Sequence, residues 1–170
     1  LECMALRPDL QFISEHRIVK STVAVITNVR PDHLDVMGPT IDDVAVALAG
    51  TVPSGAALFT SEHQRKERLA AVAAERDCEF HEVSADGMDS SLGEGFRYVE
   101  HLDNVALALA VCEHLGVSRD AAIEGMRRAE PDPGALTVHR VEEGDKEIEF
   151  INAVLDEADC LEIVESLLDR

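Results

Sequence analysis

Lysine is scarce in this sequence, and negative charge is abundant. Lysine and arginine together number 15 against 34 aspartate and glutamate residues, which gives a formal net charge of −19. Binding along a nucleic acid needs a basic surface that neutralises phosphates, so nucleic acid is excluded as a partner. So acidic a surface suits a salt-rich, halophilic cytoplasm in which ions screen the repulsion. An ordinary acidic cytosolic protein is the alternative.

Long apolar runs and paired cysteines are also missing. No run approaches the roughly 18 apolar residues that a membrane-spanning helix needs. The cysteines show no CxxC spacing, so we interpret them as buried free thiols rather than disulfides or zinc ligands. They are Cys3, Cys78, Cys112 and Cys160. A hydrophobic content of 46% predicts a folded protein, which we expect to be cytoplasmic.

The chain begins at Leu1, in a segment that looks like a strand over residues 1–4, and it has no initiator methionine. We therefore expect a fragment of a longer protein. Its 170 residues suffice for one hydrophobic core and the beginning of a second. Pro131–Gly134 is the strongest break in the chain. We predict one domain over residues 1–133 and the start of another over 134–170.

Short apolar runs alternate with helical patterns along the first domain. The expected strands are 22–29, 56–60 and 79–83, and the expected helices are 40–49, 61–76, 98–114 and 118–129. Thr40 and Ser61 are expected N-caps, and Gly116 is an expected helix end. This alternation predicts an α/β fold, a mostly parallel sheet with helices on both faces. The elements expected in the second, also α/β, domain are a hairpin of 137–142 and 147–152 and a helix over 154–168.

A polar cluster follows the first expected strand. Thr22–Val29 is rich in β-branched residues and uncharged, which is typical of a fully buried strand. Pro31 prevents the strand from continuing, and Asp32, His33 and Asp35 come directly after it. Ligand sites in open α/β sheets lie at the carboxyl ends of the strands. We therefore expect the chemistry of the protein at this turn.

The sequence Ile-Thr-Asn-Val-Arg-Pro-Asp-His-Leu-Asp-Val-Met-Gly at 26–38 resembles the central-domain signature of the Mur ligase superfamily of ATP-dependent amide ligases. Together with Leu-Glu-Cys-Met-Ala-Leu at 1–6, it is most similar to the capsule-type poly-γ-glutamate synthases, the CapB/PgsB group. Further similar segments are 101–108, 136–140 and 150–153. The resemblance ends near residue 153, which suggests a deletion or gap in the sequence there.

This resemblance implies an incomplete central ATP-binding domain, lacking its N-terminal part, followed by the start of a carboxy-terminal ligase domain. It implies that the full protein forms γ-glutamyl amide bonds in poly-γ-glutamate capsule synthesis, through an acyl phosphate made with ATP and Mg²⁺. The implied partners are glutamate or poly-γ-glutamate as substrate, and small membrane-embedded synthase subunits that would associate the protein with the membrane. We also expect a homo-oligomer.

By the same resemblance, His33 and Glu2 bind Mg²⁺ between nucleotide and substrate, and the catalytic candidates are His33, Asp32 and Asn28. Mg²⁺ prefers oxygen ligands, so phosphate and water oxygens have to complete a site that contains an imidazole. Asp32 and Asp35 would orient His33, while Asn28 either turns its amide toward the substrate or stabilises the turn. The alternatives are a capped turn in which His33 bonds only backbone groups, and a chain-end carboxylate without a role for Glu2.

Asn104 and Arg140 are the nucleotide contacts that the resemblance implies. An Asn side chain offers a donor and an acceptor, which suits the edge of adenine, and Arg140 presents a planar fork suited to phosphate. The alternatives are an ordinary residue of a helix start for Asn104 and an interdomain salt bridge for Arg140. Arg30, beside the motif, either makes the site locally positive for an anionic substrate or is an exposed turn residue.

The sequence departs from the family pattern in two places. It contains no GxxxxGK[ST] phosphate-binding loop, so we expect this stretch alone to be inactive. The lysine that many superfamily members carry downstream of the motif histidine is missing, because that region is Ala47–Ala49. A second Mg²⁺ would therefore have to be held differently.

Other interpretations stay open at this point. A folylpolyglutamate-type or cyanophycin-type ligase belongs to the same superfamily, and a non-catalytic remnant would keep the fold without turnover. A metal-dependent hydrolase built on Asp32, His33 and Asp35 would act without ATP.

Overall fold

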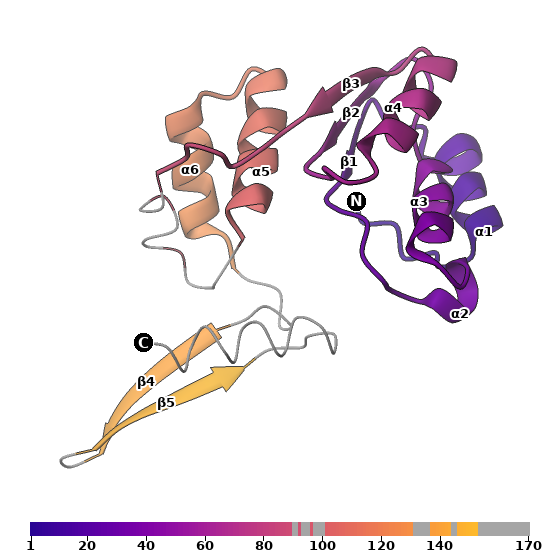
Figure 1. Ribbon diagram of the computed structural model, residues 1–170. Coiled ribbons are helices and arrows are strands. Elements are labelled where there is room, and N and C mark those ends of the chain that lie inside the picture. The colour runs from indigo at the N-terminus through magenta and orange to yellow at the C-terminus, as the bar shows by residue number, and fades with distance from the viewer. Residues whose placement is uncertain (90–91, 93–95, 97–100, 131–136, 144–145, 153–170) are drawn as a thin grey trace. The chain divides into compact units, whose positions relative to one another are not determined.

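The computed structural model describes residues 1–89, 92, 96, 101–130, 137–143 and 146–152 (Figure 1). The chain separates into two compact units, one formed by Leu1–Gly87 with Leu102–Arg119 and the other by Met88–His101 with Asp120–Arg170. The domain boundary predicted after residue 133 lies outside the described residues. That boundary stays a prediction.

The first unit is built around a parallel sheet. Its strands are β1 (Val23–Ile26), β2 (Ala57–Thr60) and β3 (Glu79–Glu82), in the order β1-β2-β3. The register pairs Val23 with Ala57 and Ala57 with Glu79, so the strands begin and end together. Parallel neighbours need a crossover connection, which α3 (Ile41–Ala49) and α4 (Lys66–Glu75) provide. The prediction of an α/β fold with a parallel sheet is confirmed.

Both faces of this sheet are covered, as the sequence predicts. On one face, Leu58 of β2 packs with Ala49 of α3 and Leu69 of α4 in a buried core. On the other face, Phe59 of β2 packs with Leu107 of α5 (Leu102–His114). Successive residues of a strand point to opposite faces, so these neighbours in β2 serve the two cores. Full burial of a side chain of this size stabilises the fold by roughly 1.5–3 kcal/mol.

β1 is shorter and more exposed than the sequence predicts. Of the predicted strand Thr22–Val29, only Val23–Ile26 is β1, and Val25 is 47% exposed. The prediction of full burial is wrong because β1 lies at an edge of the described sheet, whereas β2 lies at its centre and is buried throughout. The strand expected over residues 1–4 is also wrong, since Leu1–Leu6 has no regular structure. An extended segment becomes a strand only where a neighbour pairs with its backbone.

Helix ends follow two of the predicted signals and depart from a third. The Thr40 hydroxyl accepts from the Asp43 N–H at 3.2 Å, and the Asp43 carboxylate accepts from the Thr40 N–H at 3.0 Å. This capping box confirms the predicted start of α3. Gly116 follows α5 with a left-handed φ of +81°, as expected of a helix end. α4 begins at Lys66, so the predicted cap at Ser61 is wrong.

Three short elements are not predicted by the sequence: α1 (Pro8–Ile13), a π-helix η1 (Ser14–Val19) and α2 (Leu34–Met37). α5 begins at Leu102, later than the predicted residue 98. Further along the chain, α6 matches the predicted helix, and β4 and β5 form the predicted antiparallel hairpin. Their bounds are Arg119–Arg128, Thr137–Glu143 and Lys146–Asn152. The helix predicted over 154–168 lies outside the described residues.

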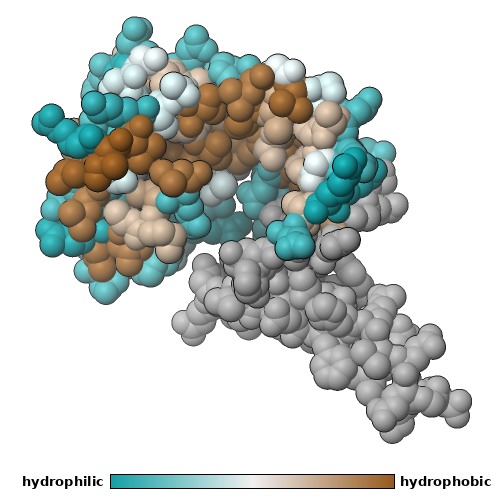
Figure 2. Space-filling model, turned by 180° about the vertical axis from the view of Figure 1, so that it is seen from behind, coloured by the Kyte–Doolittle hydropathy of each residue, from teal (hydrophilic) through white to brown (hydrophobic). Residues whose placement is uncertain are grey.

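The surface of the first unit exposes many large hydrophobic side chains. They are concentrated in the N-terminal segment, with members such as Leu10, Phe12, Ile13 and Ile18. Figure 2 shows hydrophobic surface gathered into patches on one face rather than scattered singly. Among the described helices, none has the length and apolar character needed to cross a membrane.

The cysteines agree in part with the prediction of buried free thiols. All three described cysteines are free, and Cys78 is buried. Burial raises the pKa of the Cys78 thiol, because the charged thiolate is poorly solvated there. The prediction of burial is wrong for Cys3, which is exposed, and Cys112 is half-buried. Cys160 lies outside the described residues.

Candidate functional site

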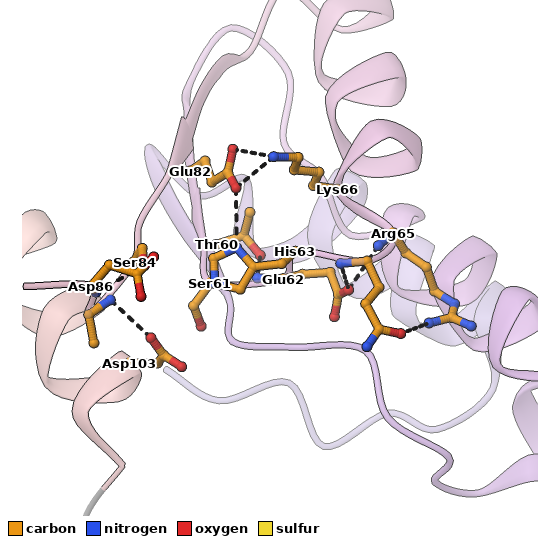
Figure 3. A network of polar contacts seen from close by, with 12 residues as sticks. Thr60, Ser61, Glu62, His63, Arg65, Lys66, Glu82, Ser84, Asp86 and Asp103 are labelled. Atoms are coloured by element: carbon orange, nitrogen blue, oxygen red, sulfur yellow. Dashed lines mark hydrogen bonds and ion pairs between the residues drawn. The ribbon is translucent and has the colours of Figure 1, made fainter.

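The carboxyl ends of the three strands lie at one edge of the sheet because all three run in the same direction. β1 ends at Ile26, β2 at Thr60 and β3 at Glu82. The loop after each strand therefore starts from this common edge, where ligand sites of open α/β sheets are found. Figure 3 shows polar side chains from the loops after β2 and β3 converging here.

The turn after β1 is anchored at Val29. Its backbone N–H donates to Oε2 of Glu62 at 2.6 Å, across 33 positions of sequence. Val29 is 6% exposed, and it packs with Val44 and Ala45 of α3. Two residues earlier, the carbonyl oxygen of Thr27 accepts a hydrogen bond from the Ser61 hydroxyl at 2.6 Å. The backbone on both sides of the half-buried Asn28 is thus fixed by the loop that follows β2.

The carboxylate of Glu62 is buried, with 5% of the residue exposed. Besides Val29, it accepts from the backbone N–H groups of Gln64 at 2.7 Å and Arg65 at 2.8 Å, both through Oε1. A buried carboxylate needs such donors to offset the loss of solvation. The Arg65 guanidinium in turn bonds Asp42 of α3 at 2.9 Å, which ties the start of α4 to the start of α3.

His33 occupies an unusual backbone conformation at the start of α2. Its φ of 46° and ψ of 43° are left-handed, which is uncommon for any residue other than glycine. Its carbonyl oxygen accepts from the N–H groups of Val36 and Met37, each at 2.9 Å, and so begins the helix. The imidazole is 45% exposed, with Nε2 lying 3.5 Å from Oδ1 of Asp32.

Gly38 closes the motif against α3. Its φ of 131° and ψ of 156° fall in a region that only glycine occupies readily. A Cβ at this position would lie 2.3 Å from the Cβ of Asp43, the residue that completes the capping box. The turn that carries His33 therefore ends in direct contact with the first turn of α3.

A second polar group surrounds Glu82 at the end of β3 (Figure 3). Its carboxylate accepts from Lys66 Nζ at 2.8 Å and lies 3.2 Å from His63 Nδ1. The hydrogen bonds from Lys66 and His63 hold the pKa of the Glu82 carboxyl below its usual value, and the same contact with Glu82 raises the pKa of Lys66.

The amino end of α5 is also tied to this edge. Oδ1 of Asp103 accepts from the backbone N–H of Ala85, which follows β3, at 3.0 Å (Figure 3). Asn104, the predicted adenine contact, is the next residue and is half-buried. Its position in the first turn of α5 places it near the carboxyl edge of the sheet. Its role in binding adenine stays a prediction.

The other predicted site residues lie elsewhere or are exposed. Glu2 is exposed in the irregular segment 1–6. Arg140 lies in β4 opposite Glu149 of β5, and belongs to the second compact unit. Asp35 is exposed in the first turn of α2, and its orienting role stays a prediction.

The donor set near His33 fits one kind of metal site. In the part of the chain that the structure describes, no group of three or more His, Cys, Asp or Glu side chains is arranged to hold a metal ion. An all-protein site is therefore a poor fit to these residues. Mg²⁺ is usually bound through one or two side chains, with waters and substrate phosphates as its other ligands. An exposed imidazole with a carboxylate 3.5 Å away fits such a partial site.

Sequence reasoning missed Ser61 and Glu62. A serine and a glutamate before a helical pattern are typical of an N-cap and a first helical turn. Their contacts with Thr27 and Val29 cross more than 30 positions of sequence and leave no local signal. The one usable sign is that they directly follow Thr60, the end of a strand buried throughout.

Comparisons with known proteins identify the relatives of this chain. No protein-family model matches it. It is 38% identical over 170 residues to the capsule biosynthesis protein CapB of Bacillus anthracis, covering 99% of the chain and 37% of that protein. It is 36% identical over 137 residues to the PGA synthase CapB of Bacillus subtilis, covering 81% of the chain and 35% of that protein. Over almost its whole length the chain is therefore similar to part of the CapB proteins.

Solved structures support the same fold. Escherichia coli FolC in complex with DHPP and ADP matches with a TM-score of 0.68 at 24% identity, over 89% of this chain and 39% of that one. An S73A mutant of L. casei FPGS matches with a TM-score of 0.65 at 14% identity, over 89% of this chain and 43% of that one. Identities this low show the fold alone. The chain spans little more than a third of the length of the curated relatives it matches.

Proposed function

We propose that the protein containing this chain is an ATP-dependent ligase that forms γ-glutamyl amide bonds in poly-γ-glutamate, the polymer of a capsule. The observation that carries the proposal is the 38% identity to the B. anthracis capsule biosynthesis protein CapB over 170 residues. The B. subtilis relative named PGA synthase supports the same product class.

The reaction would proceed in two displacements. A glutamate carboxylate oxygen attacks the γ-phosphorus of ATP, which gives an acyl phosphate and releases ADP. The amine of another glutamate unit then attacks the acyl carbon, and inorganic phosphate leaves as the amide forms. Both steps concentrate negative charge on phosphate oxygens, so electrostatic stabilisation is the main need of the site.

We assign His33 as a metal ligand next to the substrate and Asp32 as the residue that orients it. A divalent ion bound there, Mg²⁺ in the cell, would neutralise charge on the phosphates. The imidazole is exposed enough to bind a metal ion, and Asp32 lies beside it to fix the orientation of the ring. A neighbour, the Yersinia pestis folylpolyglutamate synthase/dihydrofolate synthase, is described with AMPPNP and Mn bound. That precedent supports a nucleotide and a divalent ion for the present chain.

Asn28, Asn104 and Arg140 complete the proposed assignment. Asn28 is held at the carboxyl edge by its neighbours' backbone contacts, which suits an amide aimed at the substrate. Asn104 at the start of α5 would contact adenine, and Arg140 would contact the nucleotide phosphates. Glu2 is retained as the second metal ligand.

A polymerisation assay tests this proposal. The intact protein is incubated with ATP, Mg²⁺ and glutamate, with ADP release and labelled polymer measured in parallel. We expect ADP and phosphate in equal amounts, and a product whose γ-linkage shows in its NMR spectrum. Ligation of glutamate onto a folate instead would favour the folylpolyglutamate-type alternative, and metal-dependent hydrolysis without ATP would contradict the ligase altogether.

A further inference from the structure

Two consecutive residues at the end of β2 reach across to the segment that follows β1. The Ser61 hydroxyl donates to the carbonyl oxygen of Thr27 at 2.6 Å, and the Glu62 carboxylate accepts from the N–H of Val29 at 2.6 Å. The residue between those two backbone contacts is Asn28. The backbone path through Asn28, the proposed substrate-facing residue, is therefore fixed by the loop that follows β2.

Glu62 divides its two oxygens between two loops. Oε2 serves the turn after β1, whereas Oε1 accepts from the N–H groups of Gln64 and Arg65 in the loop that leads into α4. The Glu62 N–H itself donates to the Thr60 hydroxyl at 3.1 Å, and Thr60 is fully buried. The backbone N–H and Oε1 of Glu62 are thus both held within the loop after β2, which leaves Oε2 for Val29.

The chemistry of this contact requires a carboxylate. Three backbone N–H groups point at Glu62, and each needs an acceptor. A glutamine of the same shape offers one carbonyl oxygen and one NH₂ group. Whichever way that amide is turned, its NH₂ group would face a backbone N–H donor on one of the two loops.

The held segment leads directly to His33. Val29 is fixed through its N–H by Glu62 and through its side chain by Val44 and Ala45. Between Val29 and His33 lie Arg30, Pro31 and Asp32, and the proline ring restricts the backbone further. The next fixed point is the His33 carbonyl at the start of α2. The position of the imidazole therefore depends on where Val29 is held.

We propose that Glu62 is a positioning residue of the ligase site: it holds the Asn28–His33 turn at the edge of the sheet so that the His33 imidazole meets the metal–nucleotide complex. This inference rests on the proposed function. It assigns Glu62 no contact with substrate, because the carboxylate is buried and its contacts are with the backbone of the two loops.

The test compares Glu62→Gln with Glu82→Gln in the intact protein. Both variants make the same chemical change at the same edge of the sheet, but Glu82 bonds Lys66 and His63 rather than the turn after β1. Two quantities are measured well below the unfolding temperature of each variant. One is the hydrogen-exchange rate of the Val29 amide without ligands, and the other is the affinity for Mn²⁺ in the presence of AMPPNP.

We expect Glu62→Gln to accelerate exchange at Val29 and to weaken Mn²⁺ binding about 10- to 100-fold, the usual effect of losing a residue that supports a metal ligand. Glu82→Gln should leave both values within about twofold of the wild type. If Glu62→Gln does not fold, Ser61→Ala, which releases only Thr27, should show the same two changes in smaller degree.

The outcomes separate the two proposals. Unchanged Mn²⁺ affinity in folded Glu62→Gln, with the wild type binding normally, would overturn the positioning role and leave the ligase proposal intact. Unaltered Val29 exchange would overturn it as well. Absence of nucleotide-dependent Mn²⁺ binding in the wild type would instead overturn the proposed function and, with it, the ligand-directed role of Glu62.

Discussion

Oδ1 of Asp32 lies 3.5 Å from Nε2 of His33, the next residue in the sequence, whose backbone is left-handed. The Asp32 carboxylate and the His33 imidazole thus lie side by side at the start of α2. A non-glycine residue in this conformation costs of order 1–3 kcal/mol and persists only where the surrounding structure enforces it. The segment that contains His33 is bounded by Val29, whose N–H bonds Glu62, and by Gly38, which lies against Asp43 of α3.

Gly38 should be among the least replaceable residues outside the hydrophobic cores. We expect Gly38→Ala to lower the free energy of unfolding by about 3 kcal/mol, because its backbone region suits only glycine and the new Cβ would lie 2.3 Å from that of Asp43. Gly55→Ala is the matched control, since Gly55 has φ +61° with open space around it. It should cost only about 1–2 kcal/mol. Equal losses by urea unfolding would refute the packing argument.

Arg76 links the end of α4 to the end of α3. Its Nη1 bonds the carbonyl oxygens of Val52 and of Gly50, the latter at 3.1 Å, and lies 3.0 Å from His16 Nε2. Arg76→Ala should reduce the free energy of unfolding by about 1–3 kcal/mol, because these part-buried carbonyls lose a charged donor.

Arg68→Ala, an exposed arginine of the same helix, serves as the control for Arg76→Ala. It should change the unfolding free energy by less than about 0.5 kcal/mol. If Arg68→Ala lost as much unfolding free energy as Arg76→Ala, the contacts of Arg76 with the carbonyl oxygens would not be the cause of the loss.

The contact between Lys66 and Glu82 makes stability depend on pH at both ends of the scale. The pKa of Glu82 is lowered from 4.5, so its contribution is present above about pH 4.5 and is lost as the pH falls through the lowered folded value. The pKa of Lys66 is raised from 10.5, so its contribution to stability is present below about pH 10.5 and is lost as the pH rises through the raised folded value.

Glu82→Gln should therefore lower the melting temperature slightly between pH 4.5 and 10.5. The difference from the wild type should shrink in acid below that window. A difference that grows as the pH falls below 4.5 would contradict the sign of the Glu82 shift.

Salt should stabilise this protein. With a net charge of −19, like charges repel across the folded surface more than they do in the expanded chain. Raising KCl from about 0.1 M to about 1 M shortens the screening length from about 10 Å to about 3 Å. We expect the melting temperature to rise over this range, and a fall would show that surface ion pairs outweigh the repulsion.

Much of the fold follows from local patterns. The alternation of apolar runs and amphipathic helices predicts the parallel sheet, and the Thr40 capping box has a recognisable sequence signature. The exposure of Val25 does not follow, because burial of a strand depends on which strand occupies the centre of the sheet. That information lies in the pairing of distant segments.

The candidate site, too, can be predicted only in part from the local sequence. The turn around His33 is visible in the sequence, because unusual polar residues directly follow an apolar strand. The role of Glu62 is not visible, since its partner Val29 lies 33 positions away. Local reasoning assigns Ser61 and Glu62 to a helix start that the structure places at Lys66.

The most direct test of the central claim is the affinity of the intact protein for Mg²⁺ in the presence of nucleotide, compared between the wild type and His33→Ala. Because alanine keeps the strained backbone, His33→Gly is measured beside it to separate loss of the imidazole from strain. We predict that both variants bind Mg²⁺ at least about tenfold more weakly, because losing even a residue that only supports a metal ligand costs about 10- to 100-fold in affinity. Equal affinities in the wild type and both variants would contradict the assignment of His33 as a metal ligand, and with it the account of this site.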